Sequence, residues 1–234
     1  MFVPSFFLII SAINAPIAAA ETLPEFSASD FNIVETGSAR YDDCVTMLEA
    51  DLEIGRIAAQ QWALEGGGAE AQHCLAIADS KAGFNKLAAI RLDELAERKD
   101  AGDDYMRARI LSQAANLWLK AGETERAANS LGAALALTPD SGELQLTAAA
   151  VFAKQNKWND TLKAVDHAEE KGFISVTGYI NRARAQYEMG AYRGAADDVV
   201  RALSLDPVNI DALTLRGDIQ RTGIIIDVAY ETPQ

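Results

Sequence analysis

The chain has 234 residues, of which 49% are hydrophobic, and its formal net charge is −13. This size supports one or two domains with a sizeable core, and the shortage of positive charge excludes a nucleic-acid-binding protein, which needs a basic face. Ala, Leu, Glu, Asp and Arg dominate, while Val, Ile and aromatic residues are sparse after the first 35 residues, which favours helices over strands.

The N-terminal stretch has the pattern of a secretory signal peptide. It carries no charged side chain in its first 20 residues, residues 6–10 are apolar, Pro16 interrupts the run, and residues 18–20 are small. We therefore expect a signal peptide over residues 1–20, with cleavage after Ala20. A membrane anchor is the alternative, although prolines interrupt a stretch that is near the ~20-residue minimum for a span. We expect the mature chain to be exported without stable membrane insertion.

Export would place the only two cysteines, Cys44 and Cys74, in an oxidising compartment, where an even number of cysteines indicates a disulfide. Two buried free thiols are the alternative. A bridge across 30 residues would stabilise the fold by about 3–4 kcal/mol in the loop-entropy description. It would also tie the first helices to the segment that follows them.

The segment after the signal peptide is expected to change from extended to helical. Residues 21–40 mix Pro, Gly, Ser and acidic residues without periodicity, which predicts an extended leader. Apolar residues then recur at helical spacing, and the glycines at 66–68 end a helical pair over residues 41–68. A second helical pair follows over residues 69–102. We interpret the acidic link at 99–104 as a longer turn or an extension of a helix.

The second half of the chain repeats a residue pattern every 34 residues. The glycine-like turn residues Gly122, Asn156 and Gly190 share this spacing, as do three further sets: Ala127, Thr161 and Ala195; Ala134, Ala168 and Ala202; Pro139, Phe173 and Pro207. A fixed period near 34 predicts a solenoid of helical hairpins, because helices approach to about 8–10 Å only where the crossing residues are small. The units span 108–141, 142–175 and 176–209, with a partial unit at 210–223 and an apolar tail at 224–234.

These units resemble the tetratricopeptide repeat (TPR). The third unit fits best, through Tyr179, Ala183, Gly190, Tyr192, Ala195, Ala202 and Pro207. The resemblance covers residues 69–223 and implies an all-α fold, a right-handed α-α superhelical solenoid of tetratricopeptide-like hairpins. The residues ahead of the repeats (Cys44, Trp62, the glycines at 66–68 and His73-Cys74) are similar to those of exported TPR proteins of Gram-negative bacteria.

No group of residues has the pattern of a catalytic or metal site. His73, Cys74 and Cys44 are zinc-ligand types, but their spacing matches no common zinc pattern, and we expect a disulfide beside a surface histidine. Adjacent carboxylates such as Asp197 and Asp198 point about 100° apart on a helix and are expected on solvated faces. The glycines at 66–68 lack the Lys-Ser or Lys-Thr of a phosphate loop. We therefore expect neither an enzyme nor a cofactor.

The TPR resemblance implies that the first helix of each hairpin lines a concave groove. The candidate groove residues, taken from the consensus positions, are Arg109, Asn116, Lys120, Lys154, Arg184 and Tyr187. Their polar, lightly basic character suits an extended peptide with acidic groups, and an ordinary solvated face is the alternative. The carboxylate clamp of some TPR proteins is not expected, because Ser112 stands where the clamp needs a lysine.

We therefore expect a non-catalytic, periplasmic or secreted scaffold that binds a protein or peptide partner on its concave face. The alternative is an accessory structural subunit of a cell-envelope assembly or export complex, which would bind through convex or terminal surfaces. The apolar, β-branched residues 224–230 are expected either to cap the last hairpin or to promote self-association, because a solenoid needs a polar terminal cap.

Overall fold

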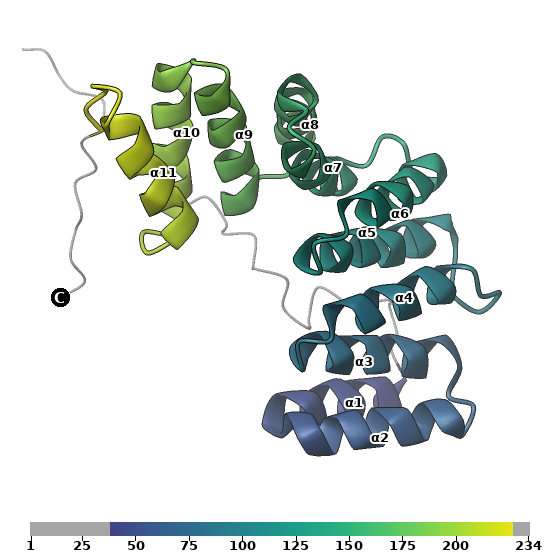
Figure 1. Cartoon of the computed structure of the whole chain (residues 1–234). Helices are drawn as coiled ribbons and strands as arrows, with labels where there is room; N and C mark the ends of the chain where they lie inside the picture. The colour runs from purple at the N-terminus through teal and green to yellow at the C-terminus, as the bar shows by residue number, and fades with distance from the viewer. Residues whose placement is uncertain (1–37, 227–234) are drawn as a thin grey trace, which may run out of the picture.

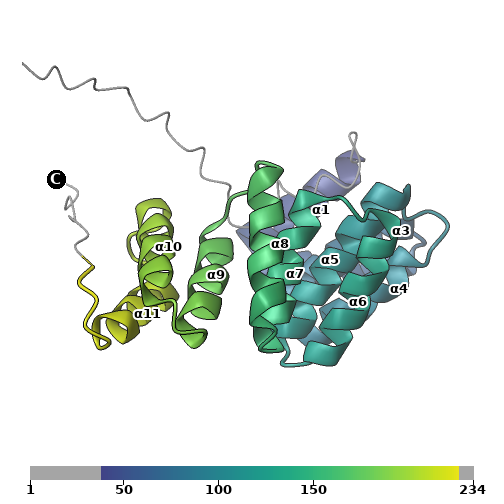
Figure 2. The same ribbon diagram turned by 90° about the horizontal axis from the view of Figure 1, so that it is seen from above.

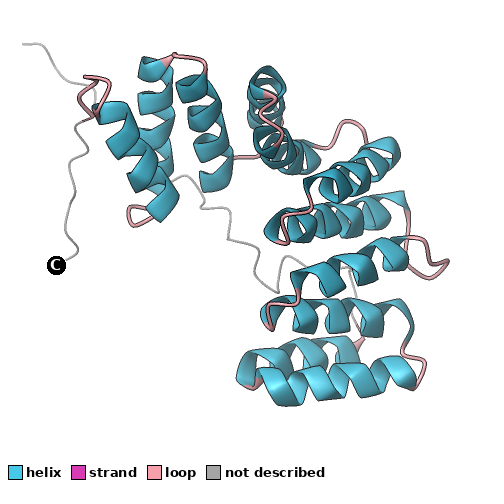
Figure 3. Cartoon of the chain, in the orientation of Figure 1, coloured by secondary structure: helices cyan, strands magenta, loops and turns pink. Residues whose placement is uncertain are grey.

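The computed structural model describes residues 38–226, and this part of the chain contains helices and loops but no strand (Figure 3). The all-α prediction is confirmed. The predicted signal peptide and the greater part of the leader lie outside the described residues, as do residues 227–234 of the tail. The helices, in chain order, are α1 (Ala39–Ala50), α2 (Leu52–Leu64), α3 (Gly68–Lys81), α4 (Asn85–Ala96), α5 (Asp104–Lys120), α6 (Thr124–Leu137), α7 (Gly142–Lys154), α8 (Trp158–Glu170), α9 (Val176–Glu188), α10 (Tyr192–Leu205) and α11 (Ile210–Gln220).

The helices form five antiparallel pairs, α1/α2 to α9/α10, and α11 begins a sixth. We call the first helix of each pair helix A and the second helix B. Helices A of neighbouring pairs touch, as in α5 with α7, α7 with α9 and α9 with α11, so the A helices form one layer of a superhelical solenoid. The stack α1–α6 and the stack α9–α11 point in different directions, with α7 and α8 between them (Figures 1 and 2).

Two kinds of local signal start the helices. Helices A after the longer loops begin at side-chain caps, such as Asp103 before α5, Ser141 before α7 and Asn209 before α11. The B helices α4, α6, α8 and α10 have no such cap and follow a tight turn that contains one residue with positive φ. Asn156 takes φ 56° where the equivalent Gly122 takes 78°, so the 34-residue pattern of glycine-like residues marks these turns.

The acidic link at 99–104 is both a longer loop and a helix extension. Helix α5 begins at Asp104, four residues before the expected unit start at 108, and reaches 17 residues where α7 has 13. The loop before it is fixed by Arg98, which donates to both carboxylate oxygens of Asp100, while Asp100 also accepts from the backbone N–H of Ala69. At the other end, α1 begins at Ala39 because Ser38 caps it.

Small residues fill the crossings between paired helices. The side chains at the repeated positions Ala127, Ala134, Thr161, Ala168, Ala195 and Ala202 are all fully buried. Larger apolar residues pack around them in separate clusters: one on α1–α3, a second that extends from α3 to α8, and a third on α9–α11. The main aliphatic core is therefore interrupted between α8 and α9.

A buried ion cluster bridges this interruption. The Arg182 side chain on α9 is 7% exposed and donates to Asp166 and Glu169 of α8, both at 2.7 Å, and to both oxygens of Asp198 on α10 at 2.8 and 2.9 Å. Arg201 also pairs with Asp198. Asp198 is therefore buried and paired, and the expectation of a solvated face at this position is wrong. The cause is the arginine sixteen residues earlier in the sequence, because a carboxylate is stable in the interior only beside a compensating charge.

The predicted disulfide is present: Cys44 of α1 is bonded to Cys74 of α3. At the C-terminal end, Ile224 and Ile226 pack against the α9–α11 cluster, whereas Ile225 is 89% exposed. None of the helices α1–α11 is both long and apolar enough to span a membrane.

Candidate functional site

Three of the six predicted groove residues link neighbouring A helices. The Arg109 Nε on α5 lies 3.5 Å from the Glu143 carboxylate on α7, and the Asn116 amide donates to the Thr147 hydroxyl over 3.4 Å. Arg184 on α9 lies 3.5 Å from Asp218 on α11. These contacts hold successive pairs of the solenoid together, so the three side chains have a role in the spacing of the helices.

The two lysines among the candidates, Lys120 and Lys154, are exposed and, unlike these three residues, do not link neighbouring A helices. Lys120 is the last residue of α5 and Lys154 is the last residue of α7. Lys81 ends α3 in the same way, 39 residues before Lys120. Within residues 38–226 none of the three forms an ion pair, and they make a row along three successive A helices.

The sixth candidate, Tyr187, lies near the end of α9 and is partly buried. Its ring is 5.4 Å from that of Tyr192 on α10, and the Arg184 guanidinium lies 5.9 Å from its ring centre. The structure therefore places Tyr187 beside Arg184, one helical pair further along the solenoid than the row of lysines.

Further polar contacts connect the A helices in their interior. The Tyr41 hydroxyl on α1 lies 2.7 Å from His73 Nδ1 on α3, and His73 Nε2 lies 2.9 Å from the Gln113 amide oxygen on α5. Because an amide oxygen only accepts, Nε2 carries the proton and Nδ1 accepts from Tyr41. His73 is 0% exposed, so the expectation of a surface histidine is wrong: it lies beneath α1, which the disulfide at the adjacent Cys74 ties in place.

Burial controls the charge of this histidine. Loss of solvation lowers the pKa of His73 to about 4; the hydrogen bond to Gln113 opposes this effect, and the nearby Arg109 cation adds to it. Burial also raises the pKa of Tyr41 far above its ordinary value. Both groups are therefore neutral near pH 7, which suits a structural link better than acid–base chemistry.

A hollow of about 540 Å³ lies beside Lys120, and sequence reasoning did not find it. The turn between α3 and α4 and the end of α5 supply its lining, and two of the large apolar side chains there are exposed: Phe84 by 50% and Leu87 by 38%. In the sequence, the hollow is indicated only by a large apolar residue, Phe84, directly after the turn residue Gly83. The lining residues are Gly83, Phe84, Asn85, Lys86, Leu87, Ile90, Lys120 and Ala121.

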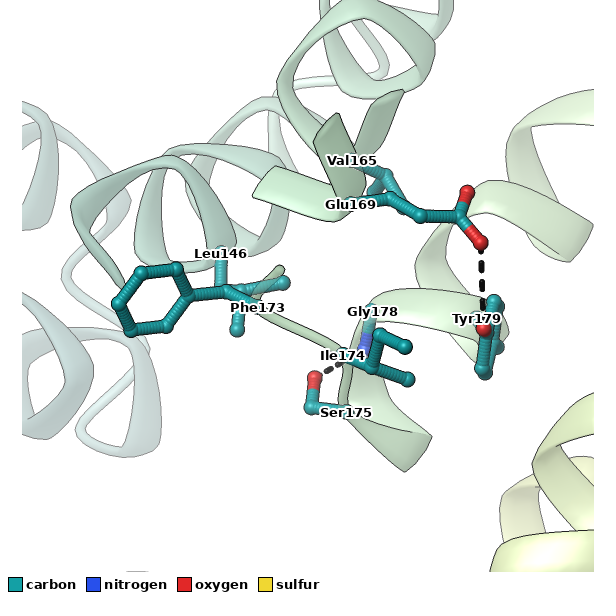
Figure 4. A pocket seen from close by; sticks show the side chains of 8 residues that line it. All are labelled: Leu146, Val165, Glu169, Phe173, Ile174, Ser175, Gly178 and Tyr179. Atoms are coloured by element: carbon teal, nitrogen blue, oxygen red, sulfur yellow. Dashed lines mark hydrogen bonds between the residues drawn. The ribbon is translucent and has the colours of Figure 1, made fainter. Parts of the chain in front are cut away.

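A second cavity lies where α7, α8 and α9 meet (Figure 4). Its volume of about 10 Å³ is close to the minimum for one water molecule, so it cannot hold an organic ligand. Glu169 and Tyr179, which line it, are joined by a hydrogen bond and belong to the surroundings of Arg182. The lining residues are Leu146, Val165, Glu169, Phe173, Ile174, Ser175, Gly178 and Tyr179.

Across residues 38–226, no group of three or more His, Cys, Asp or Glu side chains is placed to hold a metal ion. The described A helices carry hydrogen-bonding side chains such as Asn116 and exposed ammonium groups such as those of Lys120 and Lys154.

Comparison with known structures identifies the fold. A TPR protein from Parabacteroides merdae ATCC 43184 is 16% identical over 80% of this chain and 74% of that chain, with a TM-score of 0.61. YrrB, described as a TPR protein with an unusual peptide-binding site, is 14% identical over 76% of this chain and 90% of its own, with a TM-score of 0.56. The thermophilic TPR protein TTC0263 of Thermus thermophilus is 17% identical over 78% of this chain and 97% of its own, also with a TM-score of 0.56.

A scan against protein-family models gives no match to the sequence, and neither does a search of curated proteins. At the identities given above, the structural similarity establishes the fold: the chain has the fold of the TPR superhelical solenoids. The predicted architecture is therefore confirmed.

Proposed function

We propose that the chain is a non-catalytic scaffold that binds a protein or peptide through its layer of A helices and the adjoining turns. The observation that supports this most directly is the row of exposed lysines at the ends of three successive A helices, Lys81, Lys120 and Lys154. These cations have no ion-pair partner in the described part of an acidic protein, so a ligand with carboxylates can reach them. The peptide-binding site of YrrB is an example of this use of the fold.

The structure changes the roles that we give to the predicted groove residues. Arg109, Asn116 and Arg184 set the spacing of helices A, and Lys120 and Lys154 are the contact residues of the proposal. Tyr187 stays a candidate contact at the far end of the groove. We expect the partner to lie along the ends of α3, α5 and α7.

We further propose that the chain works in the periplasm or outside the cell. The apolar N-terminal sequence supports export, and the Cys44–Cys74 disulfide supports an oxidising compartment. Cell fractionation with an antibody against the folded domain tests this. Recovery of the chain from the cytoplasm with both thiols reduced contradicts the proposal.

Charge reversal tests the binding face. The chain carrying Lys120→Glu and Lys154→Glu should lose its partner in an affinity capture from periplasmic extract, with at least a roughly tenfold fall in recovered protein. The matched control carries Lys99→Glu and Lys163→Glu, which make the same change of charge on exposed residues of a loop between two pairs and of α8. Equal capture by both variants contradicts the proposed face.

A second candidate function, as an accessory structural subunit of a cell-envelope assembly or export complex, has support from the N-terminal end of the solenoid. Helix α2 exposes Ile54 and Ile57 by 60% each and Leu64 by 83%, an apolar surface on the outermost pair. A partner that is captured by the lysine variant but lost on Ile57→Glu and Leu64→Glu would favour this function over the first.

A further inference from the structure

The hollow beside Lys120 differs in chemistry from the inner layer of A helices. Its apolar part consists of Phe84 and Leu87, together with Ile90 on the same helix. Phe84 and Leu87 stay 50% and 38% exposed although burial of a large apolar side chain is favourable. Its volume of about 540 Å³ falls in the range of small-ligand and side-chain pockets.

The Phe84 ring of the hollow is held in place by Arg56 of α2. The Arg56 guanidinium lies 4.9 Å from the centre of the Phe84 ring, and Arg56 is itself fixed by an ion pair of 2.9 Å to Asp79, which is fully buried. Arg91 holds the other oxygen of Asp79 at 2.7 Å. The exposed ring is therefore positioned before any ligand arrives, and this reduces the entropic cost of binding.

Two lysines flank the apolar residues. Lys86 is engaged by Glu123 at 2.6 Å, whereas Lys120 has no ion pair among the described residues. One ammonium group beside the apolar residues is thus available to a carboxylate.

The charge around the hollow is opposite to that of the rest of the molecule. Three of the five turns from helix A to helix B, at 81–86, 120–126 and 154–160, together carry six basic and three acidic residues, a net charge of +3. Three of the five loops from helix B to the next helix A, at 97–104, 138–143 and 169–175, carry three basic and eight acidic residues, a net charge of −5. An acidic ligand is therefore attracted to the A-to-B turns and repelled by the opposite edge.

We propose that this hollow binds an acidic peptide segment of a partner protein through a large apolar side chain that has carboxylates next to it. The apolar side chain packs on Phe84, Leu87 and Ile90, and a neighbouring carboxylate pairs with Lys120. This inference rests on the proposed scaffold function and adds to it the place of recognition and the chemistry of the ligand. The hollow lies at the rim of the solenoid, at the A-to-B turns, and it uses residues of a B helix that the predicted groove did not include.

The probe is a fluorescein-labelled peptide with blocked ends, in which one Phe is flanked on each side by two Asp within a Gly-Ser sequence. Two matched probes replace the Phe by Ala or all four Asp by Asn. Fluorescence anisotropy with the full chain at low salt should show binding of the first probe that is at least about fivefold tighter than that of either matched probe. Equal binding of the three probes overturns the proposal.

Variants of the protein locate the binding. Leu87→Ser and Lys120→Glu should each weaken the first probe by about fivefold or more, since they remove an apolar contact and reverse the available charge. Val208→Ser and Lys163→Glu make the same kinds of change on exposed residues elsewhere and should stay within about twofold of the unmodified chain. Unchanged binding by Leu87→Ser, in a protein whose thermal unfolding is also unchanged, overturns the proposal.

Two further outcomes separate this inference from the function on which it rests. Partner capture that depends on Lys120 and Lys154 but survives Leu87→Ser overturns the hollow and leaves the scaffold function intact. Sedimentation that shows self-association of the chain, abolished by Leu87→Ser, overturns the partner-peptide assignment because the occupant is then a second copy.

Discussion

Acidification should destabilise the fold through His73, the buried histidine between Tyr41 and Gln113. Its imidazole is 0% exposed, accepts from the Tyr41 hydroxyl and donates to the Gln113 amide oxygen. A proton added at Nδ1 would place a charge away from water and turn the acceptor of the Tyr41 hydrogen bond into a second donor. Arg109, whose charge also lowers the pKa of His73, opposes the same proton.

The sign and the size of the change in the free energy of unfolding follow from the pKa values of His73 in the unfolded and the folded chain. In the unfolded chain the pKa is about 6.5, and in the folded chain it is about 4. Between these values the unfolded state binds more protons, so the free energy of unfolding falls as the pH falls through this window. Since one pKa unit corresponds to about 1.4 kcal/mol, the full loss is about 3 kcal/mol, complete below pH 4 and absent above pH 6.5.

Urea unfolding of the chain, followed by circular dichroism at several pH values from about 7.5 to about 4, measures this loss. Carboxylates contribute to the pH dependence as well, so the quantity to examine is the difference between the unmodified chain and His73→Gln. That difference should shrink by about 3 kcal/mol across the window. His167→Gln, which changes the partly exposed histidine beside Asp140, should follow the unmodified chain. Parallel curves for the unmodified chain and His73→Gln would refute the argument.

Three further predictions concern single features of the fold. Arg182→Met should lower the free energy of unfolding by about 3 kcal/mol, since it leaves the buried Asp198 carboxylate short of a partner; a urea titration showing a loss below about 1 kcal/mol contradicts this. Reduction of Cys44–Cys74 should cost about 3–4 kcal/mol in the same assay, and equal stability of the two forms contradicts it. Asn156→Ala should cost about 1 kcal/mol in thermal unfolding and Asn156→Gly nothing, because φ is 56° there; the reverse order contradicts the reasoning.

The fold could be predicted because helix packing leaves a periodic record in the sequence. Two helices that cross closely need a small residue at the crossing, and the turn between them needs a residue that tolerates positive φ. Both requirements recur in every pair, so Ala127 and Gly122 have equivalents 34 residues later, and even the divergent Asn156 keeps the backbone conformation of its position.

The buried polar groups could not be predicted in the same way. From the sequence alone, a charged or titratable side chain is predicted to be exposed unless its partner is known. The partners of Asp198 and His73 lie on other helices. Arg182 is sixteen residues from Asp198, and Gln113 is forty residues from His73. Neither distance matches the repeat period, so nothing in the pattern pairs these residues. The hollow beside Lys120 could not be predicted for a related reason. Its lining comes from the α3–α4 turn with the start of α4 and from the end of α5, and these segments meet only when the two helical pairs stack.

Some polar contacts between helices can nevertheless be predicted from the sequence, as the candidate groove residues show. Arg109 pairs with Glu143 and Arg184 pairs with Asp218, and in both cases the acidic partner lies 34 residues later, at the same position of the next helix A. Equivalent positions of adjacent A helices face each other, and in these two cases opposite charges one repeat apart form a pair. Lys120 is followed at the same distance by Lys154, which cannot pair with it, so Lys120 remains available to a ligand. Lys154 is followed at this distance by Glu188, but no ion pair joins the two within residues 38–226. A long side chain on helix A is therefore a candidate contact for a ligand when the residue one period away cannot pair with it.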